Sequence, residues 1–310
     1  MSARLAAWAQ ARRDFEWQGH RLFVRDEGTG PAVVLLHGYP TGSYDWHAVW
    51  PWLQPGLRLI APDFLGMGFS DKPRSHNYTI TSHAASVDAL LDALGVGEFH
   101  LVAHDLGVRV AQELLARREQ AHGRAAAIRS LVLLNGAMCP EAYRPRPIQR
   151  LLASPLGGWI APHIPRSAFV RTVRELFGPR RLASEALIDD FWSLLQYGQG
   201  QRVTHAVGRF WTPRRALRDR LVGALLRSRV PLRVINGARD PNSGRHMVQR
   251  LLELSPGTDV VWLEHAGHWP HIEEPEATAA AIREIIEAPG QGAGPAACGA
   301  ASAGTWHSAQ

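Results

Sequence analysis

The chain contains little cysteine, little lysine and no long apolar run. Its two cysteines, Cys139 and Cys298, are far apart, and the second lies in a Gly- and Ala-rich tail. The sequence therefore gives no support for a disulfide framework and favours a reducing compartment such as the cytoplasm. No uninterrupted apolar stretch reaches the length of about 18 residues that a membrane-spanning helix needs. Residues 1–13 carry three arginines and lack a continuous apolar core, so we expect a short amphipathic helix there instead of a signal peptide.

The charge of the chain is basic and comes almost entirely from arginine. Lys72 is the single lysine among 34 basic residues, the net charge is +6 and the isoelectric point is near 10.0. Segment 137–229 is the most basic part, with 16 arginines and six acidic residues. No basic run is interleaved with aromatics as in a nucleic-acid module, so we expect no nucleic-acid partner. We interpret the charge as a solvated basic surface, with attraction of anionic substrates or membrane surfaces as the alternative.

Short apolar runs alternate with helical patterns along most of the chain. Residues 15–17 and 21–24 flank a Gln-Gly-His turn and predict an opening hairpin. Further apolar runs predict strands at 32–36, 57–62, 99–103, 131–134, 232–235 and 260–263, and helical patterns cover 82–94, 108–118 and 276–287. This alternation predicts an α/β fold with a mostly parallel sheet and helices on both faces.

The strand rhythm is interrupted between residues 137 and 229, where the chain is rich in Pro and Arg and its pattern is helical. We therefore predict a core formed by residues 1–136 and 230–287, with 137–229 as an inserted helical domain. Residues 288–310 contain no Asp, Glu, Lys or Arg and consist mainly of Gly, Ala, Ser and Pro. Such a segment buries too little apolar surface to fold, which predicts a disordered tail.

An acidic residue stands where an apolar strand changes into a helix. Asp105 follows the run 99–104, a layout typical of a nucleophile elbow. Its small neighbours Ala103 and Gly107 favour this tight turn over the simpler interpretation of Asp105 as a helix N-cap. Residues 99–110 include no Ser or Cys, so a serine esterase would have no nucleophile here. A carboxylate nucleophile attacks carbon by displacement and forms an alkyl ester, which water then hydrolyses.

The general base and its supporting acid are expected in two later loops. His268 follows the last predicted strand, where the base of such a triad belongs, although His265 and His271 compete for the role. Asp240 follows the preceding strand and would orient the base, with an Asx-turn as its alternative role. The loop after residue 134 offers Asn135 instead of a carboxylate. The order nucleophile, acid, base is therefore complete.

The backbone N–H groups of an oxyanion hole are expected from loop 37–40, which directly follows a buried strand. Gly38 permits a close approach of this loop, and His37 and Gly38 form its supporting part. We expect the N–H groups of Tyr39 and Leu106 to bind first the nucleophile's oxygen and then the tetrahedral intermediate.

Taken together, these motifs resemble the α/β-hydrolases of the epoxide hydrolase and haloalkane dehalogenase branch. The resemblance covers about residues 15–287, with the helical insertion in the place of that family's cap domain. The runs 37–46 and 63–74 and the start of the insertion, 135–145, are more specifically similar to the mesoderm-specific transcript protein group. The resemblance implies an α/β-hydrolase fold, a catalytic triad and a small-molecule substrate.

Departures from the family pattern bear on the leaving group. Haloalkane dehalogenases usually carry Trp after the nucleophile and Asn in the oxyanion loop, where this chain has Leu106 and Tyr39. Epoxide hydrolases use cap tyrosines as proton donors, and the insertion has two, Tyr143 and Tyr197; core packing is the alternative role of Tyr197. The resemblance thus favours epoxide hydrolysis to a diol, with hydrolytic dehalogenation of haloalkanes or haloacids as the alternative. Arg109 resembles a carboxylate-binding residue of fluoroacetate dehalogenases, with a salt bridge as its alternative role.

A non-catalytic interaction protein on a hydrolase scaffold is the hypothesis from another class, but such proteins generally lose a triad member, and all three candidates are present here. Because neither a metal-ligand cluster nor a nucleotide loop is evident in the sequence, we expect no metal and no cofactor. We expect a monomer or a small homo-oligomer without a membrane span.

Overall fold

The computed structural model describes residues 1–121, 126–211 and 215–288. The predicted disordered tail, apart from its first residue, lies outside the described residues, and so does Cys298. Cys139 is buried as a free thiol. None of the described helices is both long and apolar enough to span a membrane.

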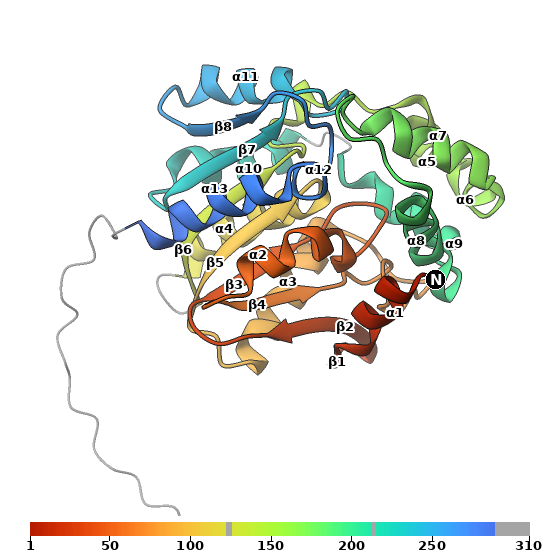
Figure 1. Cartoon of the computed structure of the whole chain (residues 1–310), viewed down its shortest axis with the longest axis horizontal. Helices are drawn as coiled ribbons and strands as arrows, with labels where there is room; N and C mark the ends of the chain where they lie inside the picture. Colours follow the sequence, from red (N-terminus) through yellow and green to blue (C-terminus); the bar gives the residue numbers. More distant parts are fainter. Residues whose placement is uncertain (122–125, 212–214, 289–310) are drawn as a thin grey trace, which may run out of the picture.

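An eight-stranded sheet forms the centre of the molecule, in the order β1-β2-β4-β3-β5-β6-β7-β8 (Figure 1). The pairs β1–β2 and β2–β4 are antiparallel, and every other pair is parallel. The strands are β1 (Arg12–Trp17), β2 (His20–Glu27), β3 (Ala32–Leu36), β4 (Arg58–Pro62), β5 (Glu98–His104), β6 (Ala127–Leu134), β7 (Leu232–Gly237) and β8 (Asp259–Leu263). The opening hairpin and the mostly parallel sheet are therefore confirmed.

Helices cover both faces of the sheet, because its central strands are apolar on both sides. Along β3, Val34 and Leu36 face one core and Val33 and Leu35 face the other. The helices of the core are α1 (Ala3–Gln10), α2 (Trp50–Leu53), α3 (Ile80–Ala93), α4 (Leu106–Ala121), α11 (Arg245–Leu254), α12 (Pro270–Glu273) and α13 (Pro275–Glu287). The predicted N-terminal helix is present as α1, whereas α11 was not predicted.

The chain between β6 and β7 forms helices and no strand in its described part. These helices are α5 (Pro147–Ala153), α6 (Gly157–Ile160), α7 (Arg166–Leu176), α8 (Glu185–Gln196), α9 (Gln201–Val207) and α10 (Arg215–Arg227). Helices α5 to α9 gather on one side of the sheet domain, with α6 at the outer end (Figure 1). Helix α10 instead lies against α4, where the Arg220 guanidinium donates to both oxygens of Glu113 at 2.9 and 3.0 Å.

The parallel strands bring distant loops to one edge of the sheet. Loop 37–40 follows β3, Asp105 follows β5, Asn135 follows β6, Asp240 follows β7 and His268 lies in the loop after β8. Because parallel strands have their carboxyl ends at the same edge, these residues can meet although up to 231 positions separate them.

A buried carboxylate joins the loop after β3 to the loop after β4. Asp63, which follows β4, accepts hydrogen bonds from the backbone N–H of Ser43 at 2.5 Å and of Phe69 at 2.6 Å. Its side chain is buried, and the Ser70 hydroxyl donates to its backbone carbonyl. Asp63 thus fixes the loop that leads into the site from β3.

Replacing this carboxylate should destabilise the fold strongly. We expect Asp63→Ala to lower the free energy of unfolding by about 2–4 kcal/mol, because it leaves two buried N–H groups without acceptors. Asp14→Ala is the control: that carboxylate is half-exposed in a surface ion pair, and its loss should cost less than about 1 kcal/mol. Urea denaturation of both variants measures the difference; equal, small losses would contradict the role given to Asp63.

Candidate active site

Asp105 occupies a strained turn between β5 and α4. Its φ is +46°, in the left-handed region that non-glycine residues rarely adopt, and its N–H donates to the Asn135 carbonyl at 3.0 Å. A Cβ atom at Gly107 would come within 2.4 Å of the Leu36 carbonyl oxygen, and one at Gly38 within 2.9 Å of the Asp105 Cβ. This close packing of the loop after β3 against the tight turn at Asp105 is the geometry of a nucleophile elbow.

The Asp105 carboxylate meets backbone N–H groups on one oxygen only. Its Oδ2 accepts from the Tyr39 N–H at 3.0 Å, and the Leu106 amide also favours the charged form. Its Oδ1 has no hydrogen-bond partner among the described residues. Burial raises the pKa of Asp105 to about 6, against the opposing effect of His268 and the two amides. The group is therefore largely an anion at neutral pH, and only one of its two oxygens accepts a hydrogen bond from the described residues.

His268 forms a buried ion pair with Asp240. The His268 Nδ1 lies 2.9 Å from the Asp240 Oδ2. Burial opposes charge on His268, but Asp240 and then Asp105 outweigh it and raise the pKa of His268 to about 9. Burial likewise opposes charge on Asp240, yet its contact with His268 and its other hydrogen bonds leave the pKa of Asp240 lowered. Both shifts favour an imidazolium beside a carboxylate.

Three further donors hold the Asp240 carboxylate. The Ser243 hydroxyl donates to Oδ2 at 2.6 Å, the Asn135 amide donates to Oδ2 at 3.1 Å, and the Asn242 N–H donates to Oδ1 at 2.8 Å. Asn135 also exchanges two hydrogen bonds with the backbone of Gly237. The sequence showed Asn135 only as a position without a carboxylate, whereas the structure makes it a donor that supports the acid.

His37 is a structural member of the loop after β3. Its Nε2 accepts from the Phe64 N–H at 2.9 Å, which leaves Nδ1 as the protonated nitrogen that donates to the Gly38 carbonyl at 2.7 Å. Burial lowers the pKa of His37, in agreement with a neutral ring. His37 therefore shapes the loop that presents the Tyr39 N–H.

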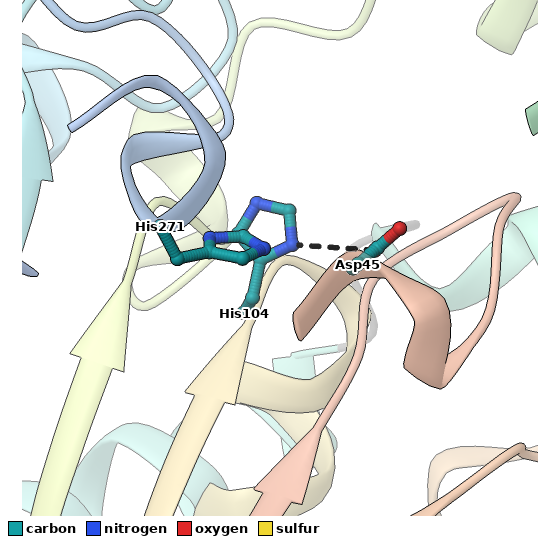
Figure 2. Close-up of side chains that lie close together, drawn as sticks. All are labelled: Asp45, His104 and His271. Atoms are coloured by element: carbon teal, nitrogen blue, oxygen red, sulfur yellow. Dashed lines mark ion pairs between the residues drawn. The ribbon is translucent and has the colours of Figure 1, made fainter. Parts of the chain in front are cut away.

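The two competing histidines lie away from Asp240. His265 is exposed. His271 is fully buried, with its ring 4.6 Å from the His104 ring and 4.5 Å from the Trp46 ring, and neither of its ring nitrogens has a hydrogen-bond partner among the described residues. Figure 2 shows His271 and His104 side by side with Asp45 next to them. We call these three residues the buried cluster.

The buried cluster lies directly behind His268. The His104 Nε2 is 2.8 Å from the His268 carbonyl oxygen; because a carbonyl only accepts, this nitrogen carries the proton. The His104 Nδ1 then faces the Asp45 Oδ2 at 3.9 Å, too far for a hydrogen bond. Burial raises the pKa of Asp45 to about 8 and lowers the pKa of His104 and of His271 well below the usual value. The cluster is therefore uncharged at neutral pH.

The buried cluster fits a metal ion poorly. One ligand atom from each residue lies within 4.8 Å of the others. Zinc binds imidazole and carboxylate at about 2.0–2.2 Å, so atoms this far apart would have to move together. The three side chains are also completely buried. We retain the absence of a metal as a prediction.

A small, mostly apolar cavity of about 80 Å³ lies against Asp105 and His268. Residues from the core and from the helices between β6 and β7 share its wall. The lining residues are Tyr39, Pro40, Thr41, Asp105, Arg146, Ile148, Gln149, Leu152, Ile164, Ala168, Phe169, Thr172, Val173, Leu176, Phe191, Leu195, Thr204, Asn242, His268 and Trp269. Most of the insertion's contribution was missed from the sequence, because a helical pattern does not show which face meets a cavity.

The two tyrosines singled out in the insertion have different surroundings. The Tyr143 hydroxyl is buried and accepts from Gln149 at 3.0 Å and from Asn242 at 3.2 Å, two residues that line the cavity. Tyr197 is 38% exposed and packs outside the cavity, against Phe69. The structure therefore brings Tyr143 next to the site and leaves Tyr197 away from it.

The side chains of Tyr39 and Arg109 lie in surroundings that the sequence did not predict for these residues. The Tyr39 side chain lines the cavity and donates from its hydroxyl to the Thr204 carbonyl at 3.2 Å, which the sequence did not indicate. Arg109 is fully buried in α4 and does not line the cavity, and burial lowers its pKa to about 10. It forms no ion pair within the described part of the chain, so neither role expected for it is observed.

The charge state of the buried cluster has a measurable effect on stability. The folded-state pKa of Asp45 is raised above that of the unfolded chain, so the wild type loses stability as pH rises from about 4 to about 8. Asp45→Asn keeps an acceptor for the Thr41 hydroxyl, which donates to Asp45 at 2.7 Å, and removes this titration. The variant should gain on the order of a few kcal/mol on the wild type between these pH values. Thermal melts across this range measure it, and a pH-independent difference would contradict the assignment.

Comparison with known proteins agrees with the α/β-hydrolase fold. A family model described as the alpha/beta hydrolase fold matches residues 31–275. The mesoderm-specific transcript homolog protein of Bos taurus is 38% identical over 288 residues, covering 89% of this chain and 85% of that protein. Haloalkane dehalogenase 2 of Mycobacterium bovis is 27% identical over 277 residues, covering 88% and 93%.

A solved structure shows the same fold. Haloalkane dehalogenase DbeA from Bradyrhizobium elkani superposes with a TM-score of 0.74 at 24% identity, covering 90% of this chain and 99% of that one. The chain belongs to the α/β-hydrolase family, in the branch that includes haloalkane dehalogenases and the mesoderm-specific transcript proteins.

Proposed function

We propose that the chain hydrolyses a small apolar electrophile, most simply an epoxide, through an alkyl ester on Asp105. The observation that carries the proposal is a buried carboxylate with one oxygen bound by the Tyr39 N–H and the other without a partner among the described residues. It faces an apolar cavity that His268 also lines. A carboxylate in such a site is less solvated than in water and is correspondingly more reactive.

In the first step the free Oδ1 of Asp105 attacks a ring carbon of the epoxide. The new oxygen–carbon bond forms as the ring carbon–oxygen bond breaks, and the ring oxygen leaves as an alkoxide that must take up a proton. Tyr143, held by Gln149 and Asn242 beside the cavity, is the proposed donor from the insertion. Tyr39 also lines the cavity, but its hydroxyl already donates to the Thr204 carbonyl and burial raises its pKa, so it is less suited to this role.

In the second step His268 removes a proton from water, and the resulting hydroxide adds to the ester carbonyl. The N–H groups of Tyr39 and Leu106 stabilise the tetrahedral oxyanion. As it collapses, the ester carbon–oxygen bond breaks, and the departing alkoxide takes the proton of the newly formed Asp105 carboxyl group, which releases the diol and restores the carboxylate. The proton held by His268 passes to the tyrosinate left by the first step. Formation of the ester removes the negative charge of Asp105, one of the charges that raise the pKa of His268. The ester therefore makes His268 a better base at the stage that needs one.

Hydrolytic dehalogenation is the second candidate, because relatives of this chain are named haloalkane dehalogenases. The same Asp105 ester would form, with halide in place of alkoxide as the leaving group. The Trp269 side chain lines the cavity and is the one indole there, whereas Leu106 and Tyr39 stand at the positions that usually bind halide in that family. The epoxide route fits these side chains better.

The proposal also covers the role of the insertion, the compartment and the oligomeric state. We propose that residues 137–229 act as a cap domain that closes the site, since α5, α7, α8 and α9 contribute to the cavity wall. We further propose a cytoplasmic enzyme, monomeric or a small homo-oligomer, that acts without cofactor.

A paired assay separates the two reactions. One arm follows diol formation from aryl and alkyl epoxides, and the other follows halide release from haloalkanes and haloacetates. We expect diol formation by the wild type and a fall of at least about 10³-fold in Asp105→Asn, which removes the nucleophile. Asp92→Asn, an exposed position on α3, is the matched control and should retain activity. Halide release without diol formation would replace the epoxide route by dehalogenation.

The two tyrosines give an internal comparison within the same assay. Tyr143→Phe should lower the rate of diol formation by about 10²-fold if its hydroxyl protonates the leaving oxygen. Tyr197→Phe should leave the rate unchanged, because that ring lies outside the cavity. Equal effects of the two substitutions would contradict the assignment of Tyr143.

A further inference from the structure

We propose that the outer end of the insertion, around α6, is a docking surface for an anionic phospholipid membrane. The surface consists of the apolar side chains Leu151, Leu156 and Trp159 and the arginines Arg150 and Arg202. It is independent of the reaction proposed for Asp105.

The apolar part of this surface is unusually exposed. Trp159 is 81% exposed, Leu156 is 61% exposed and Leu151 is 42% exposed. A scattered exposed leucine is common in proteins, but an indole almost entirely in water beside two leucines marks an interaction site. Tryptophan in particular favours the boundary between water and lipid, because its ring is apolar and its N–H remains able to donate.

The backbone around α6 is held firmly, so these side chains are not exposed through a loose loop. The N–H of Gly157 donates to the Ser154 carbonyl at 3.0 Å, and the N–H of Trp159 donates to the Leu156 carbonyl at 3.0 Å. A Cβ atom at Gly157 would lie 1.9 Å from the Leu152 carbonyl, which shows how closely this turn packs on α5. The turn is fixed while Leu156 and Trp159 project outward.

The charge of this region selects the kind of partner. Between Glu141 and Glu175 the chain has six arginines and no acidic residue, although Arg146, Arg166 and Arg174 form ion pairs with acidic residues at or beyond Glu175. Arg150 lies next to Leu151 in α5, and Arg202 lies in α9, against which α6 packs. Arg150 and Arg202 are exposed and form no ion pair with any described residue.

An apolar surface beside the two unpaired arginines Arg150 and Arg202 fits the boundary of a membrane with anionic headgroups. The apolar side chains would enter the headgroup region, and the guanidinium groups would bind phosphates. An apolar protein partner would not need the arginines, and a nucleic acid would not need the exposed leucines. An anionic lipid surface therefore explains both the exposed apolar side chains and the unpaired arginines.

The same helices carry part of the cavity wall. Leu152 of α5 lines the cavity, and its neighbour Leu151 belongs to the docking surface. Binding at a membrane would hold this wall close to lipid, from which an apolar substrate could partition.

Vesicle binding by the full chain tests the proposal without any substrate. The purified protein is sedimented with phosphatidylcholine vesicles, with or without one third phosphatidylglycerol. We expect binding to the anionic vesicles only, weakening as salt is raised. Trp159→Ala should lower the partition coefficient by about tenfold or more. Arg150→Glu should lower it by roughly thirtyfold, since it removes one positive charge and adds a negative one.

Two matched variants control for exposure and charge. Trp52→Ala alters another exposed tryptophan, on α2 of the core, and Arg229→Glu reverses an exposed charge just before β7, at the opposite edge of the sheet. Both should bind vesicles like the wild type. The proposal is overturned if the wild type does not bind, if neutral vesicles bind equally, or if Trp159→Ala changes nothing. It is also overturned if ultracentrifugation shows a dimer that Trp159→Ala dissociates, because the surface would then be an interface between copies of the chain.

Discussion

The close approach of two loops around Asp105 is the constraint on which the site depends. Asp105 adopts a positive φ because the chain must turn at once from β5 into α4, and the missing side chains of Gly38 and Gly107 leave room for the turn. The strain places the carboxylate against the Tyr39 N–H. The cavity lies between this fixed carboxylate and the inserted helices.

The charged side chains at this edge of the sheet lie next to partners of opposite charge, and the residues behind them are neutral. The negative charges of Asp240 and Asp105 raise the pKa of His268. The nearby buried cluster of Asp45, His104 and His271 is uncharged at neutral pH. A neutral layer behind the imidazolium avoids a further buried charge, which would be costly without a partner. The hydrogen bond from His104 to the carbonyl oxygen of His268 also holds the backbone that carries the imidazole ring of His268. The residue that holds the backbone of His268 therefore differs from the residues that raise the pKa of its ring.

The sequence was sufficient to predict the fold and the loops that meet at the carboxyl edge of the sheet. Strand and helix periodicity and the turn at Asp105 are local signals that the sequence shows directly. It was insufficient for the cavity wall. Tyr143 and Tyr197 are equivalent in sequence terms, but only packing decides which one lies beside the cavity. The buried cluster was also hidden, because Asp45, His104 and His271 come from three segments and each has an ordinary local pattern. Asn135 shows the same limit: its local sequence gave no sign of the contact with Asp240.

The central claim is that Asp105 forms a covalent ester that His268 is needed to hydrolyse. The most direct measurement is the intact mass of His268→Gln after incubation with styrene oxide or a similar reactive epoxide, followed by peptide mapping. The account predicts an added mass of one epoxide on the peptide that contains Asp105, absent from the double variant with Asp105→Asn. An adduct on another residue, or turnover by His268→Gln at the wild-type rate without any adduct, would contradict it.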